Sequence, residues 1–157
     1  MFMFYFAYGS NMDYREMRVL CPSAAFIAVA KLPDHRLEFT RYSETHGCGV
    51  ADAVPEHGHR LWGVVYDIAE AEFGRLDQSE GYQPGRPAGE NHYVREERHV
   101  LRDGHQQEPL LVSLYLANRE PHMRMPNSSY RGLLLEGARF WHLPADYVQE
   151  LEKIEIV

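Results

Sequence analysis

The sequence predicts an α+β fold, in which a mixed β-sheet is strongly curved or closed into a barrel and a few helices flank it. Two observations favour this class: strand-length apolar runs dominate the chain, and helical patterns are interspersed among them irregularly. A third concerns organisation. The chain has 157 residues, no internal repeat and no linker-like segment, which predicts one domain over residues 1–157.

Apolar, aromatic and β-branched runs place the strands. They are Phe2–Ala7, Ala25–Lys31, Arg36–Phe39, Gly49–Val54, Leu61–Ile68, His92–Leu101 and Leu110–Ala117. A turn at Pro33-Asp34 is expected to separate the second strand from the third. The run His92–Leu101 is half polar, which is typical of an edge strand. Leu110–Ala117 is almost continuously apolar, which indicates a central one.

Four segments have helical character. Met12–Leu20 follows Ser10 and Asn11, either of which can cap it, and Ala69–Ser79 is expected to stop at Gly81. Ser128 or Ser129 is expected to cap a third helix. Its apolar face contains Tyr130, Leu133, Leu134, Ala138 and Trp141. Pro144 opens the last helix, which buries Tyr147, Val148, Leu151 and Ile154.

Charge and the amino terminus exclude several classes of partner. The formal net charge is −7, and nucleic-acid or anionic-membrane binding would need clustered Lys and Arg. The apolar segment Met1–Tyr8 lacks the basic leader and cleavage pattern of a signal peptide, and it is too short to span a membrane. We therefore expect a cytoplasmic protein with no nucleic-acid or membrane partner.

Cysteines and histidines give no sign of a metal or a cofactor. Two cysteines, Cys21 and Cys48, are too few for a disulfide framework and are interpreted as reduced thiols, with a single Cys21–Cys48 bridge as the less favoured alternative. His57 and His59 lie two residues apart on an expected loop, but spacing cannot place a third ligand such as His46 or Glu56. The sequence predicts no metal site and no cofactor, and the roles of these residues stay open.

Glu80 departs from the local pattern of the second helix. It lies seven residues after Phe73 and four after Leu76, so helical spacing puts it on their inward face. A carboxyl group in apolar surroundings has a pKa above its usual ~4.3 and can exchange protons near neutral pH. The alternative is a helix-end glutamate that turns outward into water. Asp77 is a rival inward acid, for which a structural role capping a neighbouring loop is favoured.

The turn Tyr8-Gly9-Ser10-Asn11 joins the first strand to a helix start. Backbone N–H groups at such a point have no helical partner and can converge on a carboxylate or a developing oxyanion. Gly9 allows a ligand to approach the backbone closely. Taken alone, such a segment is more often only a turn.

Together these segments resemble the γ-glutamylcyclotransferase family. The start of the chain, residues 4–12 (FYFAYGSNM), is similar to its N-terminal signature, and residues 62–66 (WGVVY) with 76–82 (LDQSEGY) resemble its second signature. The end is similar as well, in Tyr115-Leu116, Pro126, Tyr130, Gly137-Ala138 and residues 143–147 (LPADY). The resemblance therefore covers nearly the whole chain in order.

The resemblance implies a mixed barrel with a cavity at one end, and an enzyme that converts a γ-glutamyl amide into 5-oxoproline and a free amine. Glu80 would be the general acid/base, and the turn Tyr8, Gly9, Ser10 and Asn11 would bind the glutamyl part. The residues expected near the cavity are Tyr5, Tyr115 and Tyr130. Members of the family are often dimers, and the edge-like strand His92–Leu101 is the feature here that suggests a homodimer.

Two questions remain open from the sequence. The first is the amine: a γ-glutamyl amino acid, a γ-glutamyl amine and a biosynthetic intermediate carrying a γ-glutamyl protecting group all offer the same bond. The second is whether the domain is instead a non-catalytic small-molecule binder. Glu80 argues against that reading, because a binder has no need of a carboxylic acid at that place.

Overall fold

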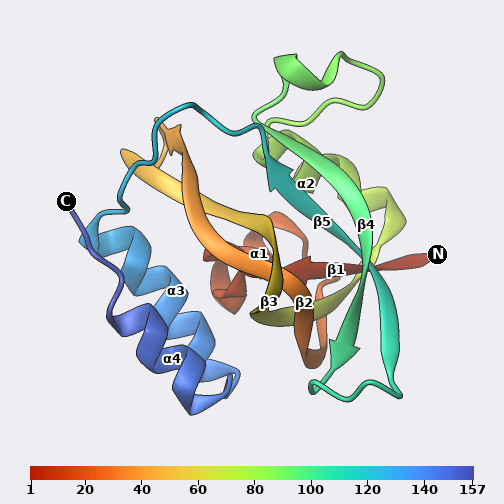
Figure 1. The fold of residues 1–157 in the computed structure, drawn as a ribbon. Helices are drawn as coiled ribbons and strands as arrows, with labels where there is room; N and C mark the ends of the chain where they lie inside the picture. Colours follow the sequence, from red (N-terminus) through yellow and green to blue (C-terminus); the bar gives the residue numbers. More distant parts are fainter.

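A closed five-stranded barrel forms the body of the computed structural model, which describes residues 1–157 (Figure 1). The strands are β1 (Phe2–Ala7), β2 (Ala25–Ser43), β3 (Cys48–Ala69), β4 (Tyr93–Arg102) and β5 (Pro109–Ala117). Their order around the barrel is β1-β3-β2-β4-β5. The sheet is mixed, because β1 pairs parallel with β5 while the other pairs are antiparallel. The predicted α+β fold with a closed, mixed barrel is confirmed.

Two long strands replace four predicted short ones. The turn expected at Pro33-Asp34 is wrong, since β2 continues through it with Asp34 at a φ of 57°. The break lies in the partner instead. Pro33 pairs with Arg60 but His35 pairs with Pro55, so residues 56–59 of β3 bulge out of the ladder. Such irregularities bend a strand and increase its twist, which helps this sheet to close.

Short helices connect the strands, and two longer helices lie together on one side of the barrel (Figure 1). Their bounds are η1 (Ser10–Met12), α1 (Tyr14–Leu20), η2 (Glu70–Glu72), α2 (Phe73–Ser79), η3 (Ala88–Glu90), α3 (Ser128–Phe140) and α4 (Ala145–Glu152). The N-caps predicted for α1 and α3 are wrong. Asp13 accepts the first amides of α1 because Ser10–Met12 already forms a 3-10 turn, and Asn127 accepts the amide of Tyr130 in α3.

Strand β4 is an edge strand over most of its length, and its C-terminal end closes the barrel. It pairs with β5 from Tyr93 to Leu101, but with β2 only at Leu101 and Arg102. The edge-like character predicted for His92–Leu101 therefore describes most of the strand, and its last residues close the barrel. The central position predicted for β5 agrees with its pairing to both β4 and β1.

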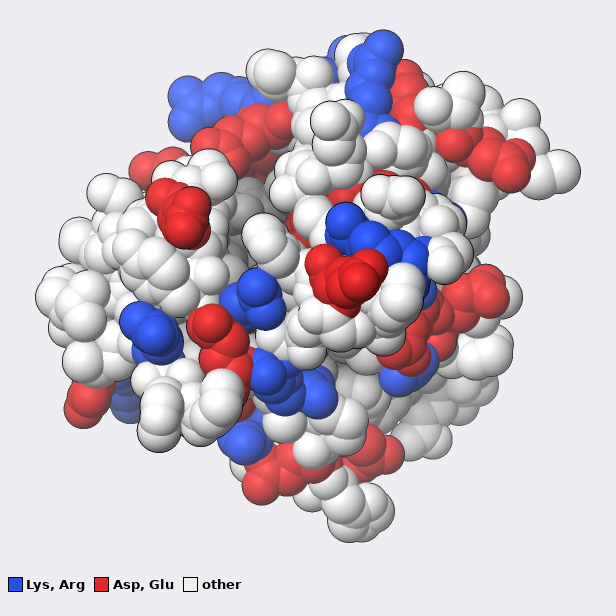
Figure 2. All heavy atoms as spheres, turned by 90° about the horizontal axis from the view of Figure 1, so that it is seen from above, with Lys and Arg blue, Asp and Glu red and all other residues white.

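The remaining surface features are ordinary. Acidic and basic side chains alternate over the face drawn in Figure 2, without a large field of one sign. None of the helices has the length and apolar character that crossing a bilayer requires. His57 lies beside Asp34 and His59 beside Glu56, and no cluster of three or more potential metal ligands is formed. Cys21 and Cys48 are both buried free thiols.

Candidate active site

A cavity of about 1100 Å³ opens at the end of the barrel where β1 and β5 terminate and β4 begins. All eight residues predicted for the site line it: Tyr5, Tyr8, Gly9, Ser10, Asn11, Glu80, Tyr115 and Tyr130. They come from β1, the turn after it, the end of α2, β5 and α3. The fold thus brings together side chains that are up to 125 positions apart, from Tyr5 to Tyr130.

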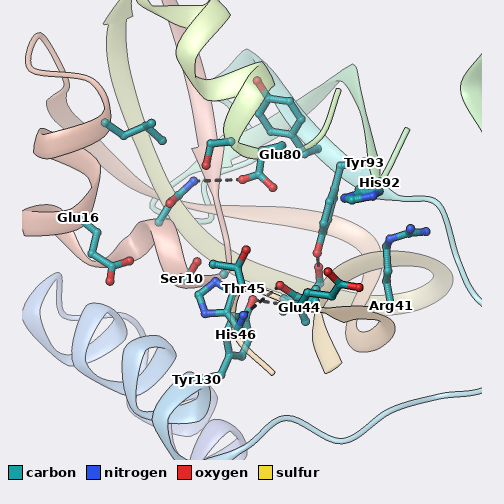
Figure 3. A pocket seen from close by; sticks show the side chains of 18 of the residues that line it. Ser10, Glu16, Arg41, Glu44, Thr45, His46, Glu80, His92, Tyr93 and Tyr130 are labelled. Atoms are coloured by element: carbon teal, nitrogen blue, oxygen red, sulfur yellow. Dashed lines mark hydrogen bonds between the residues drawn. The ribbon is translucent and has the colours of Figure 1, made fainter. Parts of the chain in front are cut away.

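Helix α2 delivers Glu80 to this cavity. Phe73 and Leu76 bury one face of the helix, and Glu80 follows on that face as its C-terminal cap. Gly81 then adopts a φ of 65°, a left-handed conformation that ends the helix as predicted. Glu80 is half-buried and points into the cavity, with Tyr130 and His46 on the opposite wall (Figure 3). The outward-turned alternative is not observed.

Asn11 holds the carboxyl group of Glu80. Its side-chain Nδ2 donates to Glu80 Oε1 at 3.2 Å and to the Tyr5 hydroxyl at 3.0 Å. The Tyr66 hydroxyl donates to the Asn11 backbone carbonyl at 2.9 Å, and this bond holds the backbone of Asn11 in place. The second carboxyl oxygen of Glu80 has no protein donor and faces the cavity.

Desolvation sets the acidity of this group. Burial raises the pKa of Glu80 from 4.5 to about 7, because the dense protein around the carboxyl group disfavours its charged form. The hydrogen bond from Asn11 opposes this effect and lowers the pKa. The raised pKa expected from the helical spacing is therefore found, and it places the group where both protonation states are populated near neutral pH.

The turn beside Glu80 offers unpaired backbone donors. Within it, the amide of Met12 donates to the Gly9 carbonyl at 3.1 Å, and the amide of Asp13 donates to the Ser10 carbonyl at 3.0 Å. The preceding amides, those of Gly9, Ser10 and Asn11, donate to no protein acceptor. Three successive free amides next to a cavity can bind an anion or a partial negative charge.

Gly9 is needed where the turn meets α3. A Cβ atom at Gly9 would lie 3.3 Å from the Tyr130 hydroxyl oxygen and 3.4 Å from the Ala51 Cβ. The Tyr130 hydroxyl accepts the Ala51 amide at 3.1 Å, so it cannot easily move away. A side chain at Gly9 would therefore press against a fixed wall of the cavity.

The tyrosines mostly use their hydroxyl groups within the protein. Tyr8 donates to the Tyr115 carbonyl, and Tyr115 donates to Asp77 Oδ1 at 2.6 Å. Both residues line the cavity, and these two donors are already engaged within the protein. Burial raises the pKa of Tyr130 well above its ordinary value, so this hydroxyl stays protonated and available as a donor.

Several lining residues were missed by sequence reasoning. Tyr93, at the start of β4, forms one side wall and donates its hydroxyl to the Ala51 carbonyl (Figure 3). Arg41 and His46 come from the end of β2 and the hairpin that follows it. His46 packs edge-on against Tyr130 at 4.9 Å between ring centroids. The sequence predicts no strand or helix for residues 40–48, and an unassigned segment does not indicate which part of the molecule it covers.

Comparisons with known proteins agree with this geometry. Residues 5–132 match the family model described as gamma-glutamyl cyclotransferase, AIG2-like. The chain is 32% identical over 155 residues to the gamma-glutamylcyclotransferase of Homo sapiens, an alignment that covers 96% of this chain and 78% of that protein. The corresponding protein of Bos taurus is 33% identical over 156 residues, with the same shares covered.

Solved structures give the same result. A structure titled gamma-glutamyl cyclotransferase superposes with a TM-score of 0.89 at 29% identity, covering 100% of this chain and 90% of that one. The curated relatives are enzymes by name, and the predicted family, the predicted fold and the predicted enzymatic character are all confirmed. This chain belongs to the gamma-glutamyl cyclotransferase, AIG2-like family, and that membership supports a cyclotransferase function.

Proposed function

We propose that this enzyme converts a γ-glutamyl amide into 5-oxoproline and a free amine, with Glu80 as the group that transfers the proton. One observation carries the proposal: a carboxyl group with a pKa of about 7 is held by Asn11 at the wall of a cavity, beside a turn with three free amides. This combination supplies, at one place, a proton acceptor and N–H donors that can stabilise a negative charge.

The nucleophile in this reaction is the substrate's own α-amine. It attacks the γ-carbonyl carbon, a C–N bond closes the five-membered ring, and the original amide C–N bond breaks. Glu80 as a carboxylate accepts the proton that the α-ammonium group releases, and as a carboxylic acid it returns that proton to the departing amine. Holding the glutamyl chain folded back supplies much of the acceleration, since oriented intramolecular reactions reach effective molarities of about 10⁵–10⁸ M.

The turn from Gly9 to Asn11 is suited to the charge that develops. During attack the γ-carbonyl oxygen becomes negative, and fixed N–H donors stabilise it without reorganising. The same amides could hold the substrate's α-carboxylate instead, with Tyr130 as a further donor. Either role uses donors that have no partner in the free protein.

A 5-oxoproline release assay tests the proposal. The panel contains γ-glutamyl dipeptides, γ-glutamyl amines and a γ-glutamyl-protected amino alcohol, so the same experiment identifies the amine. We expect Glu80→Gln to lose turnover by at least about 10²-fold while substrate binding, measured by calorimetry, is retained, because general acid–base catalysis contributes about 10²–10⁴-fold.

Glu97→Gln is the matched control. Glu97 is an exposed glutamate on β4 that does not line the cavity, so this variant should turn over like the wild type. Near-normal 5-oxoproline release by Glu80→Gln would refute the role of Glu80. Binding of γ-glutamyl compounds without release by the wild type would instead favour a binding domain.

A further inference from the structure

We propose that Asp77 is a positioning residue that fixes the end of helix α2, so that the carboxyl group of Glu80 points into the cavity. The inference rests on the proposed function of Glu80 and names a second acid on which that function depends. Asp77 itself does not line the cavity, whereas Glu80 does, so Asp77 would act through its neighbours and not on the substrate.

The side chain of Asp77 ties α2 to two adjacent strands. It is only 6% exposed. Arg95 Nη1 from β4 lies 3.1 Å from both of its carboxyl oxygens, and the Tyr115 hydroxyl from β5 donates to Oδ1 at 2.6 Å. One side chain therefore links the last turn of the helix to both strands of the β4–β5 hairpin.

The backbone of Asp77 holds the residues that follow. Its carbonyl accepts the amide of Tyr82 at 2.9 Å, and it shares the amide of Glu80, at 3.2 Å, with the carbonyl of Leu76, at 3.0 Å. The backbone of Glu80 is thus anchored to the residue whose side chain is anchored to β4 and β5. A shift of Asp77 would be transmitted directly to the carboxyl group of Glu80.

Arg95 is itself held in place, so the anchor is rigid. Its guanidinium carbon lies 5.2 Å from the centroid of the Phe73 ring and 5.8 Å from that of Tyr82, which precede and follow Asp77 in the chain. An arginine that stacks on aromatic rings while pairing with a carboxylate cannot be replaced conservatively by lysine. The hydrogen-bonded cluster of Asp77, Arg95 and Tyr115 therefore holds the end of α2, and with it Glu80, against β4 and β5.

The same cluster explains why Asp77 is not the catalytic acid. Both of its oxygens accept hydrogen bonds from Arg95, and one also accepts from Tyr115. Glu80 has one protein donor and an oxygen facing the cavity. Of two inward acids three residues apart, one is committed to the protein and one is free for the substrate.

The test compares Asp77→Asn with Glu72→Gln. Both acids connect α2 to the rest of the molecule, but Glu72 does so at the other end, where it accepts the amide and hydroxyl of Ser23. We expect Asp77→Asn to lower kcat by at least about 10-fold with KM changed by less than about two-fold, since small misplacements near the chemistry are costly. Glu72→Gln should lower the melting temperature but leave kcat near that of the wild type.

A double-mutant cycle separates positioning from general destabilisation. Tyr115→Phe removes the hydroxyl bound to Asp77 and keeps the ring in the cavity, so it should also lower kcat. The double variant should be no slower than Asp77→Asn alone, because coupled residues are not additive. If Asp77→Asn does not fold, Tyr115→Phe and Arg95→Gln carry the same test of kcat.

Three results would overturn the inference. The first is a wild-type kcat in Asp77→Asn while Glu80→Gln is inactive, which leaves the proposed function intact. The second is an equal loss of kcat in Glu72→Gln, which would indicate helix docking in general. The third is an active Glu80→Gln, which would remove the proposed function and this inference together.

Discussion

At the scale of single residues, the chemistry depends on two opposing effects on Glu80. Desolvation favours its protonated form, and the hydrogen bond from Asn11 favours its carboxylate form. The balance leaves the pKa at about 7, whereas a fully solvated glutamate would always be charged near neutral pH. A group poised in this way can accept a proton from an ammonium group and return it to an amine.

The pH dependence of kcat/KM should report this balance. The proposed first step needs Glu80 as a carboxylate, so kcat/KM should rise about tenfold per pH unit below pH 7 and level off above it. Replacing Asn11 by leucine removes the donor that stabilises the carboxylate, which should move the inflection to higher pH. The substrate ionises in the same way with the wild type and with Asn11→Leu. A displacement between their two pH profiles of kcat/KM therefore reports a change in the pKa of a group on the enzyme.

Two results would contradict this expectation. A wild-type profile that is flat from pH 4 to 8 would mean that no group with a pKa near 7 controls turnover. An Asn11→Leu profile displaced to lower pH would mean that Asn11 disfavours the charged form, against the direction of its hydrogen bond. Both profiles are measured with one γ-glutamyl substrate under saturating and subsaturating conditions.

The site residues differ in how far the sequence could predict them. The inward position of Glu80 is suggested by its spacing to Phe73 and Leu76, because helical periodicity is a local property, whereas its role as general acid/base was implied by the family resemblance. Its partner Asn11 lies 69 positions earlier, and only the fold brings the two side chains to 3.2 Å. The use of the Tyr115 hydroxyl by Asp77 could not be predicted either, because a tyrosine near a cavity gives no sign of where its hydroxyl points.

At the scale of elements, the caps of the helices were the least predictable feature. Ser10 and Asn11 have good capping side chains, but here they enter a 3-10 turn and face the cavity. Asp13 takes the capping role and accepts the amide of Arg15 at 3.0 Å. A sequence segment with three candidate capping residues within four positions does not specify which one starts the helix.

Asp13→Ala should therefore weaken α1. Loss of an N-cap costs about 0.5–2 kcal/mol of unfolding free energy, and urea titration followed by circular dichroism measures it. The matched variant is Ser10→Ala, which removes no hydrogen bond from α1 and should change the unfolding free energy by less than about 0.5 kcal/mol. A larger loss in Ser10→Ala than in Asp13→Ala would mean that the cap lies where the sequence suggested.

For the strands, the sequence predicted where a strand is present, but it did not predict how far each strand extends. Each apolar run predicted within β2 and β3 lies in a strand, because the alternation of apolar residues is local. The join between Ala25–Lys31 and Arg36–Phe39 could not be predicted, because it depends on pairing with β3 around the bulge at residues 56–59. A Pro-Asp pair favours a turn only when no neighbouring strand holds it extended.

At the scale of the whole molecule, the cavity is a product of the barrel's closure. The end of β1, the hairpin between β2 and β3, the start of β4 and the end of β5 meet only because the strand order is β1-β3-β2-β4-β5. The sequence indicated a curved or closed sheet but not this order, since non-local pairing leaves little trace in local patterns. Helix α3 then covers the turn after β1 and supplies Tyr130.

The packing of α3 on that turn depends on Gly137. A Cβ atom there would lie 2.5 Å from the Met12 Cβ and 2.8 Å from its backbone carbon, and Met12 is fully buried. Gly137→Ala must therefore push the helix away from the turn that carries Ser10 and Asn11. Overpacking of this kind costs about 1–3 kcal/mol. We expect a lower unfolding free energy and a lower kcat/KM in this variant.

Gly132→Ala in the same helix separates this effect from helix propensity. Apart from its chain neighbours and the backbone of its own helix, no atom lies within 4 Å of a Cβ built there, so the variant should gain stability, by up to about 1 kcal/mol, because alanine is the better helix former. Opposite signs for two identical substitutions five positions apart would show that contact with the turn, and not the helix itself, determines the outcome. If Gly137→Ala were as stable and as active as Gly132→Ala, α3 would not be the element that holds the turn in place, and the cavity would owe its shape to the strands alone.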